Sequence, residues 1–477
     1  MITVDGGRLS PHDIAAVAAG EPVDLAEGAL RRAGEAYDLA VRTASERPVY
    51  GRTTGVGANK DVAVGRGEAA EHGLRILRSH ATSAGPPRSD ARVRATMVIR
   101  LNQLAVGASG ARPEVLDALL TLLNSRVVPT VREHGGVGTG DLAALATIGL
   151  AMPGLVWTAD DTLPFLSSNA ATLADAALAF VDLSELAWAQ IAVAATTFVA
   201  VAGQPDAFAP TVEAMTPEAG AAAVCRAVRR LTGGVPPPRR LQDPFALRCV
   251  PQVHGLVLDS LSRLAGQVET ATATGAENPA VDRDRGTVVH HGGFYASYLA
   301  SALDATLVAL ADSAYQSLRR IGLLLDGQIT GLTPFLTDGT PGASGAMGLE
   351  YAAASALGDL RALATPASSQ NVVLSRGVED GASFASLGAR QALDAVPAYA
   401  AVLGCELVAA ARAVRLLRLP PPDGGWGAVV QALTSSGVGY ESDVADRDLT
   451  PDIEQATICL PALAPLASSA AEAEPPG

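Results

Sequence analysis

The sequence predicts a mainly α-helical protein. Alanine, leucine, valine and glycine dominate its 477 residues, and aromatic residues make up only 4%, which suits packed helices better than a β-sandwich. Long stretches with apolar residues at helical spacing alternate with short segments rich in glycine and proline. We therefore expect a loop-rich N-terminal region, residues 1–205, and a bundle of long helices over residues 206–460.

The N-terminal region begins with short helical patterns. Residues 9–41 fit two amphipathic helices, and Ser10 followed by Pro11 is a typical N-cap and first-turn pair. A glycine-rich loop follows at 48–60. Helical spacing then recurs over three segments, 68–83, 89–107 and 113–125.

A second glycine-rich loop, His-Gly-Gly-Val-Gly-Thr-Gly-Asp-Leu at 134–142, is the most informative segment of the chain. Its four glycines allow backbone turns that other residues resist. Asp141 then stands at the N-cap position of an apolar segment, so we expect a buried helix to begin there.

The remaining helical patterns are long. They span residues 168–202, 251–274, 298–325, 343–363 and 383–417. Clustered glycine and proline at 233–238 and 420–425 predict breaks. The last segment, 461–477, is rich in alanine, serine, glutamate and proline, and we expect a disordered tail there.

The chain is acidic, with a net charge of -14 and a pI near 5.0, which argues against nucleic acid and anionic membranes as partners. The four cysteines lack CxxC spacing and lie in apolar contexts, as is typical of free thiols in a reducing compartment. No secretory signal is visible, and the longest apolar run, around 189–203, is too short to span a membrane. We therefore expect a cytoplasmic protein.

Several classes of site lack their sequence signatures. The chain has no P-loop and no Rossmann glycine fingerprint, so we predict no nucleotide cofactor. The adjacent His290 and His291 have no second ligand pair, so we predict no metal. Lys60 is the only lysine, a bias that we attribute to GC-rich coding.

Seven segments resemble, in order, motifs of the aromatic amino acid lyase family, which comprises the histidine, phenylalanine and tyrosine ammonia-lyases and related aminomutases. The resemblance covers roughly residues 5–460 and is closest in pattern to histidine ammonia-lyase. The segments are Tyr-Gly-Arg-Thr-Thr-Gly-Val-Gly at 50–57, Leu-Arg-Ser-His-Ala at 77–81, Arg-Leu-Asn at 100–102, Gly-Ala-Ser-Gly-Ala-Arg-Pro-Glu at 107–114, Gln-Asp-Pro-Phe-Ala-Leu-Arg-Cys at 242–249, Gly-Val-Glu-Asp at 377–380 and Asp-Arg-Asp-Leu-Thr-Pro-Asp-Ile at 446–453.

The glycine-rich loop resembles the cofactor loop of this family. There, Ala-Ser-Gly followed by Asp-Leu cyclises and loses two waters to give an electrophilic methylidene-imidazolone, or MIO. Gly138, Thr139 and Gly140 occupy the three positions here. Dehydration of Thr139 would leave an extra methyl group on the electrophilic carbon. The resemblance therefore implies a methyl-substituted MIO, or no cofactor if the triad does not cyclise.

The chemistry explains why such residues are needed. Eliminating ammonia from an amino acid requires removal of a non-acidic β-proton and departure of a poor leaving group, so an electrophile must first capture the substrate. The resemblance assigns the base to Tyr50, whose ordinary pKa of ~10 must be lowered by its surroundings. It assigns the carboxylate clamp to Arg248, whose planar fork suits a bidentate pair. Each has a structural alternative: Tyr50 as a loop anchor and Arg248 as a helix-start ion pair.

Further positions correspond to residues around the substrate. Asn169 matches the asparagine that holds the cofactor or the amine, although it also fits a helix N-cap. His80 and Glu379 match specificity residues; the acid at 379 favours a cationic or imidazole-bearing substrate, whereas the alternatives are a core histidine and a solvated carboxylate. Phe245 and Phe294 fall at the substrate-binding site in the family pattern.

The chain departs from the family at this site. Besides the triad, Phe245 replaces a tyrosine, and Gly-Gly-Phe-Tyr-Ala at 292–296 replaces Gly-Asn-Phe-His-Gly. Ala170 follows Asn169 where the family has glycine, and Ala273 stands where it has asparagine. These changes cluster while Tyr50 and Arg248 persist, which indicates altered chemistry or substrate.

We therefore expect the ammonia-lyase-like fold and a small-molecule amino acid substrate. The resemblance also implies a homotetramer in which several subunits build each active site. The main hypothesis is a carbon–nitrogen lyase or aminomutase. Two alternatives stay open: a member without MIO that catalyses another elimination, addition, isomerisation or cyclisation in specialised metabolism, and a catalytically silent homologue.

Overall fold

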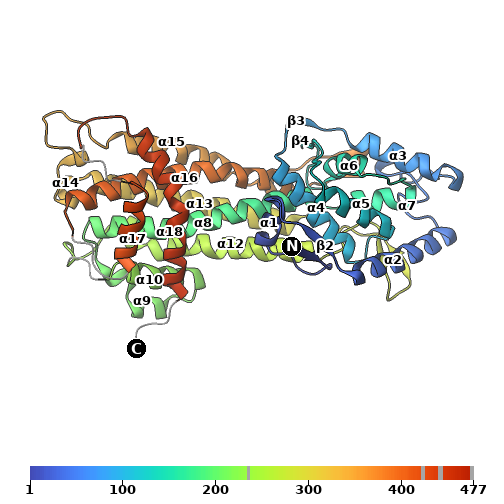
Figure 1. Cartoon of the computed structure of the whole chain (residues 1–477), viewed down its shortest axis with the longest axis horizontal. Helices are drawn as coiled ribbons and strands as arrows, with labels where there is room; N and C mark the ends of the chain where they lie inside the picture. Colours follow the sequence, from blue (N-terminus) through green and yellow to red (C-terminus); the bar gives the residue numbers. More distant parts are fainter. Residues whose placement is uncertain (234–236, 420–424, 439–443, 473–477) are drawn as a thin grey trace. The chain divides into compact units, whose positions relative to one another are not determined.

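A computed structural model describes residues 1–233, 237–419, 425–438 and 444–472 (Figure 1). It is mainly α-helical, as the sequence predicts. The chain divides into two compact units. Unit 1 contains residues 1–181, 264–304 and 366–393, and unit 2 contains the described residues of 182–263, 305–365 and 394–477.

This division differs from the boundary expected near residue 205. Four long helices each contribute residues to both units, so one cut in the sequence cannot separate them. Helical periodicity reveals where a helix lies but not how its length is shared between compact units. These helices are α8 (Ala170–Ala200), α12 (Val250–Thr272), α13 (Ser297–Leu325) and α16 (Ala385–Leu416).

Unit 1 holds the shorter helices and three two-stranded sheets. Its complete helices are α1 (Pro11–Ala18), α2 (Glu27–Glu46), α3 (Ala69–His80), α4 (Asp90–Ala105), α5 (Pro113–Asn124), α6 (Leu142–Ala151) and α7 (Ala159–Leu166). The strands β1 (Ile2–Val4) and β2 (Val23–Leu25) are parallel, whereas β3 (Ala84–Pro87) with β4 (Arg132–His134) and β5 (Ala280–Asp282) with β6 (Thr287–Val289) are antiparallel.

The predicted start of α1 is confirmed. The Ser10 hydroxyl accepts a hydrogen bond from the Asp13 backbone N–H at 3.1 Å, and the Asp13 carboxylate accepts one from the Ser10 N–H at 3.1 Å. This reciprocal capping box satisfies donors that the first turn leaves free. Pro11 fills the first helical position, where its missing N–H costs nothing.

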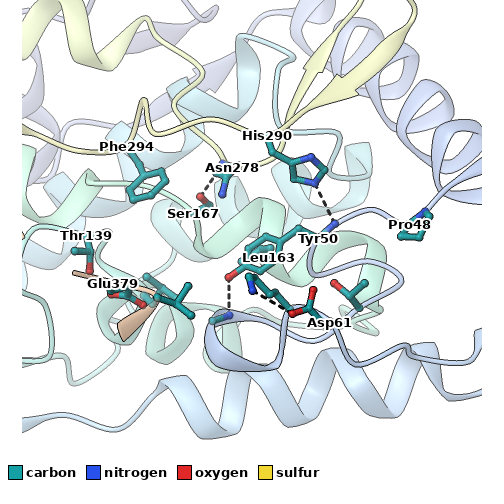
Figure 2. A pocket seen from close by; sticks show the side chains of 15 residues that line it. Pro48, Tyr50, Asp61, Thr139, Leu163, Ser167, Asn278, His290, Phe294 and Glu379 are labelled. Carbon is teal, nitrogen blue, oxygen red and sulfur yellow. Dashed lines mark hydrogen bonds and ion pairs between the residues drawn. The ribbon is translucent and has the colours of Figure 1, made fainter. Parts of the chain in front are cut away.

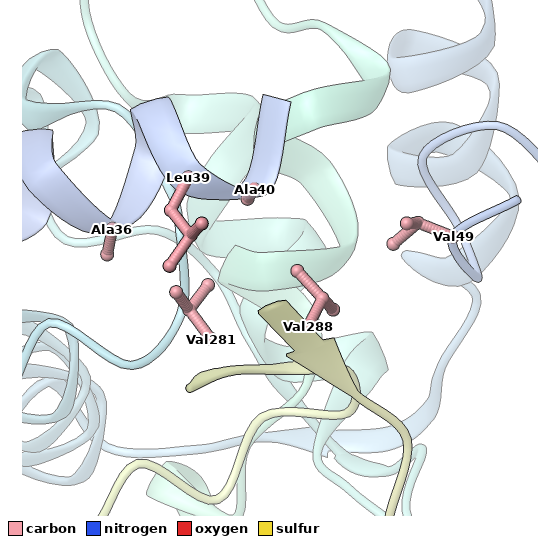
Figure 3. Packing of buried hydrophobic residues seen from close by; sticks show 6 residues of the cluster. All are labelled: Ala36, Leu39, Ala40, Val49, Val281 and Val288. Carbon is pink, nitrogen blue, oxygen red and sulfur yellow. The ribbon is translucent and has the colours of Figure 1, made fainter. Parts of the chain in front are cut away.

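A small apolar core lies where α2 meets the β5–β6 hairpin (Figure 3). Its buried members come from α2, from the loop after it and from both strands. They are Ala36, Leu39, Ala40, Val49, Val281 and Val288. Val49 is fully buried in this core, so the chain enters the following loop from a fixed point.

Unit 2 contains parts of the four long helices and several shorter ones. The latter are α9 (Pro210–Met215), α10 (Ala219–Leu231), α11 (Phe245–Arg248), α14 (Gly327–Thr330), α15 (Gly348–Leu363), α17 (Gly425–Ser435) and α18 (Thr450–Glu472). The helix α18 extends to residue 472, although the composition predicts disorder from residue 461. Leu463, Ala464 and Ala467 are buried on one face of α18, and this packing outweighs the polar composition. Residues 473–477 lie outside the described part of the chain.

A buried polar network ties the long helices together within unit 2. Arg320 on α13 pairs with Glu406 on α16, with Nε–Oε1 at 2.6 Å and Nη2–Oε2 at 2.9 Å, and both side chains are fully buried. Thr197 on α8 donates to Glu406 at 2.7 Å. His254 on α12 accepts a hydrogen bond at Nε2 from Arg320 Nη1, 3.2 Å away. Its ring proton therefore lies on Nδ1, which is 3.0 Å from the Ser313 hydroxyl. Burial, together with the charge of Arg320, holds the pKa of His254 well below its ordinary value, so this ring is neutral.

Two helical stretches of the described residues, Ala159–Ala200 and Ala385–Leu416, are long and apolar enough to cross a membrane by length and composition. Both stretches are longer than the apolar run at 189–203, from which the sequence predicted no membrane-spanning segment. In each stretch, 67% of the most apolar window is buried inside the structure. A helix that is apolar on all sides is as typical of a protein core as of a membrane span.

Breaking the buried ion pair should destabilise the protein. Glu406→Gln leaves Arg320 without its counter-charge in a buried site, so we expect a loss of about 3–5 kcal/mol in the free energy of unfolding. The double variant Arg320→Met with Glu406→Leu should lose much less, because no isolated charge remains. Urea unfolding at one fixed protein concentration measures both.

The matched control for this experiment is the surface pair of Arg31 and Glu35, in which the two side chains are 72% and 48% exposed. Glu35→Gln should change the free energy of unfolding by about 1 kcal/mol or less. An effect of Glu406→Gln no larger than that of Glu35→Gln would show that the buried pair does not stabilise unit 2.

Candidate active site

The loop that carries Tyr50 is fixed on both sides. Val49 is anchored in the core of Figure 3, and the buried Arg52 pairs with Asp160 at 3.1 Å and donates to the Gly110 carbonyl at 2.6 Å. Gly51 has a φ of +73°, and a Cβ there would collide with the Leu163 side chain. Glycine is therefore required for the loop to pass this close to α7.

The Tyr50 phenol is held by the same loop. Its oxygen accepts a hydrogen bond from the Gly57 backbone N–H at 2.7 Å, and its backbone N–H donates to His290 Nε2 at 3.3 Å. Burial raises the pKa of Tyr50 above its ordinary value, and the Glu379 carboxylate raises it further, whereas the Gly57 N–H and the Lys60 ammonium lower it. The single chain therefore does not supply the lowering that a base requires at neutral pH.

The glycine-rich loop is held by the segment that precedes α16. The Ser383 hydroxyl donates to the Gly138 carbonyl at 2.9 Å, and the Phe384 N–H donates to the Val137 carbonyl at 3.0 Å. Gly138 and Gly140 have φ values of +88° and +114°. A Cβ on Gly138 would collide with the Ser383 hydroxyl. The half-buried side chain of Thr139 lies between these two turns.

Asp141 precedes α6 as predicted, but its carboxylate caps another helix. It accepts the backbone N–H of Thr172 at 2.7 Å and the Thr172 hydroxyl at 2.9 Å, and it makes no capping hydrogen bond to α6. Thr172 lies in the first turn of α8, where free N–H groups attract a carboxylate. The predicted N-cap position of Asp141 is therefore confirmed, whereas its side chain binds the start of a neighbouring helix.

Asn169 directly precedes α8, yet its side chain is not a helix cap. The Ser168 hydroxyl instead accepts the Ala170 N–H at 2.9 Å. Asn169 donates from Nδ2 to the Phe294 carbonyl at 2.5 Å, and its buried Oδ1 has no partner among the described residues. A buried, unpaired acceptor is costly and marks a place where a donor fits.

The segment with Glu379 is a strained turn that docks on the Tyr50 loop. Ser375 and Arg376 have φ values of +51° and +56°, and Leu374 and Glu379 pair through their backbones. The Ser375 hydroxyl accepts the Ala58 N–H at 3.0 Å. Left-handed conformations of non-glycine residues persist only where the surroundings enforce them, as they do here.

A buried arginine supports the segments that carry Ser167 and Asn278. Arg100 on α4 pairs with Glu277, with Nη1–Oε1 at 2.9 Å, and donates from Nε to the Phe165 carbonyl at 2.9 Å. Both charged side chains are 1% exposed. The arginine thereby joins α7 to the segment that continues into Asn278, whose N–H donates to Ser167 at 2.9 Å.

These segments enclose a cavity of about 530 Å³ in unit 1 (Figure 2). This volume is typical of a small-molecule site. Four of the predicted residues line it: Tyr50, Thr139, Phe294 and Glu379. Gly138 and Gly140 flank Thr139 in the glycine-rich loop, and Asn169 contacts the lining through the Phe294 backbone.

The other three predicted residues do not line this cavity either. His80 is the last residue of α3, and its Nδ1 lies 2.8 Å from the Ile76 carbonyl of the same helix. Arg248 and Phe245 belong to α11 in unit 2, where the guanidinium lies 4.4 Å from the centre of the Phe245 ring. Phe245 is 64% exposed.

Six polar residues that line the cavity were not predicted from the sequence. They are Thr54, Lys60, Asp61, Ser167, Asn278 and His290. Lys60 had a visible signal as the only lysine, and we attributed it to GC-rich coding. The sequence draws attention to His290 only through the adjacent His291, as a possible metal ligand. Among the described residues, no group of three or more histidines, cysteines or acids is placed to hold a metal. Burial lowers the pKa of His290, and the charges of Arg47 and His291 lower it further.

Comparisons with known proteins agree with this architecture. The family model for aromatic amino acid lyases matches residues 9–158 and 155–435. The histidine ammonia-lyase of Symbiobacterium thermophilum is 32% identical, with 94% of each chain covered. That of Rhodospirillum rubrum is 33% identical over 94% of this chain and 90% of its own.

Solved structures show the same fold. The ergothioneine-degrading enzyme ergothionase of Treponema denticola superposes with a TM-score of 0.90 at 23% identity, covering 97% of this chain and 99% of its own. The tyrosine aminomutase of Streptomyces globisporus gives a TM-score of 0.87 at 25% identity, covering 97% of each chain.

The packing at Gly138 gives a direct test of how the glycine-rich loop is held. Gly138→Ala should lower the free energy of unfolding by about 1–3 kcal/mol, because alanine resists a positive φ and its Cβ would meet Ser383. Gly154→Ala is the matched control, since Gly154 has a φ of +69° but open space around it. Adding Ser383→Gly should recover part of the loss in Gly138→Ala. Equal losses at 138 and 154, measured by urea unfolding, would exclude close packing against Ser383.

Proposed function

The chain belongs to the aromatic amino acid lyase family, and from this premise we propose how its cavity catalyses the reaction of an ammonia-lyase or an aminomutase. Family membership makes the chain a lyase-class enzyme acting on an amino acid. The observation that carries the finer proposal is the cavity that brings Tyr50, Thr139 and Glu379 together from three separate segments.

We propose that Gly138, Thr139 and Gly140 are the site of the MIO-type group. When formed, this group supplies the electrophile that captures the substrate. Two features of the chain support the assignment. Gly138 and Gly140 adopt backbone conformations that favour glycine, and the Ser383 hydroxyl donates to the Gly138 carbonyl at 2.9 Å. Cyclisation requires the Gly140 nitrogen to attack that carbonyl carbon, and a hydrogen bond to its oxygen stabilises the negative charge that develops there.

Tyr50 is assigned as the base that removes the β-proton. The Gly57 N–H that donates to its oxygen also stabilises the phenolate. Glu379 faces the same cavity and favours a substrate with a cationic or imidazole side chain, in keeping with the histidine ammonia-lyase names of the relatives. Phe294 offers an apolar wall, and Asn169, which donates to the Phe294 carbonyl, has an Oδ1 acceptor without a partner among the described residues.

Arg248 is assigned as the carboxylate clamp from a neighbouring subunit. It lies in unit 2 and does not line the unit 1 cavity, and the family pattern implies sites shared between subunits. Its guanidinium stacks over the exposed Phe245 ring, and its buried Nε has no hydrogen-bond partner among the described residues, as expected of a donor that a carboxylate completes. His80, which contacts its own helix, has a weaker claim to a substrate role than Glu379.

A second candidate is a member of this scaffold that works without MIO. The replacement of serine by Thr139 favours it, because the extra methyl group crowds the electrophilic carbon. In that case Tyr50 and Arg248 serve another elimination, addition, isomerisation or cyclisation.

The mass of the purified protein decides between these two. If the triad cyclises, the intact mass falls short of the sequence mass by two waters, and peptide mapping locates the deficit at 138–140. Thr139→Ser should show the same deficit, whereas Thr139→Ala, which has no hydroxyl to lose, should lack the second dehydration. A full-mass wild-type protein would refute the MIO assignment.

The shared site can be tested by mixing inactive variants. Tyr50→Phe and Arg248→Met should each lower kcat/KM for ammonia release at least about 100-fold. Co-expression of the two should restore activity, because some sites then receive Tyr50 from one subunit and Arg248 from another. The control mixes Tyr50→Phe with the double variant Tyr50→Phe, Arg248→Met, which cannot complement. No recovery in the test mixture would contradict a site built between subunits.

A further inference from the structure

Lys60 is chemically singular in this protein. It is the only lysine among 35 basic residues, so the other 34 are arginines. Arginine and lysine differ in chemistry: the guanidinium is a broad planar fork, whereas the ammonium is a compact point charge on a flexible stem. Lys60 also lines the cavity that contains Tyr50.

The backbone places Lys60 on the same turn as the donor to the Tyr50 phenol. The Gly57 N–H donates to the Tyr50 oxygen at 2.7 Å, and the Gly57 carbonyl accepts the Lys60 N–H at 3.1 Å. One tight turn therefore carries both the hydrogen-bond donor to the Tyr50 phenol and a positively charged residue that lines the same cavity. The Lys60 ammonium lies 3.1 Å from the Asp61 carboxylate, and the two side chains are 48% and 87% exposed.

Two acidic residues near this phenol oppose Lys60. Glu379 and Asp61 line the same cavity and are acidic, and His290 contacts the Tyr50 backbone. Glu379 raises the pKa of Tyr50 and Lys60 lowers it. Since Asp61 is mostly exposed, water screens its attraction for Lys60 and leaves the ammonium able to act on the cavity.

We propose that Lys60 is a positioning residue whose ammonium stabilises the ionised form of the Tyr50 phenol against the carboxylate of Glu379. This proposal rests on the proposed function only in that Tyr50 is the base there. An exposed charge of this kind should alter the ratio of phenolate to phenol about three- to tenfold.

The test is a titration of Tyr50 in the full-length protein without substrate. Ring-fluorinated tyrosine replaces all eight tyrosines, and fluorine NMR follows the ionisation of each ring. Because the fluorinated ring ionises at a lower pH than tyrosine, the titration takes place while Lys60 is still charged. The Tyr50 signal is the one missing from Tyr50→Phe. We expect Lys60→Met to raise the pKa of Tyr50, equivalent to about a three- to tenfold smaller phenolate fraction at fixed pH. Lys60→Arg, which keeps the charge, should titrate close to wild type.

Two further measurements separate charge from structure. Glu379→Gln should move the Tyr50 titration in the opposite direction, to lower pH, because it removes the opposing charge. High salt should shrink the difference between Lys60→Met and Lys60→Arg, since exposed charges are screened. Acetylation of the protein removes the Lys60 charge and should reproduce Lys60→Met, whereas acetylated Lys60→Arg should not shift.

The proposal is overturned if Lys60→Met and Lys60→Arg titrate alike, or if their difference is independent of salt. It is also overturned if Glu379→Gln moves the Tyr50 signal in the same direction as Lys60→Met. None of these results depends on turnover or on the mass of the triad. Failure of the lyase assignment and failure of the Lys60 proposal are therefore observed separately.

Discussion

The cavity in unit 1 depends on one buried ion pair, between Arg100 and Glu277. Removing two charges from water is costly, and their attraction offsets that cost only when hydrogen bonds satisfy the rest of the guanidinium. Here the Phe165 carbonyl accepts from Nε at 2.9 Å and Gln103 accepts from Nη1 at 3.2 Å. These bonds hold α7 and the segment before Asn278 against α4, so the lining residues Leu163 and Asn278 share one support.

Much of the fold follows from the sequence, because helical periodicity and cap residues are local. The long helices begin and end within a few residues of their expected limits, and Ser10 caps α1 as predicted. The side-chain bonds of Asp141 and the helical end of α18 could not be predicted, because each depends on a partner distant in the sequence. Asp141 bonds Thr172 across 31 positions, and Arg226 donates to Ala471 at 2.8 Å across 245.

In the candidate site, too, the sequence predicts some residues and not others. Tyr50, Thr139, Phe294 and Glu379 lie together as the family pattern implies, because short motifs fix the loops that carry them. The sequence does not predict that His290 and Asn278 line the cavity, because their positions depend on the packing of the β5–β6 hairpin beside the Tyr50 loop. For Lys60, composition shows that the residue is unusual, but not that it lines the cavity. For Arg248, the single chain gives only the local stacking on Phe245.

The hydrogen bond between Ser383 and Gly138 also depends on the order in which the chain is synthesised. The two residues are 245 positions apart, and a ribosome that adds about 5–20 residues per second needs roughly 10 to 50 seconds to cover that distance. During this interval the nascent chain already contains the whole glycine-rich loop, but not the hydroxyl that holds its carbonyl. Any chemistry that uses this contact must therefore wait until residue 383 has been synthesised.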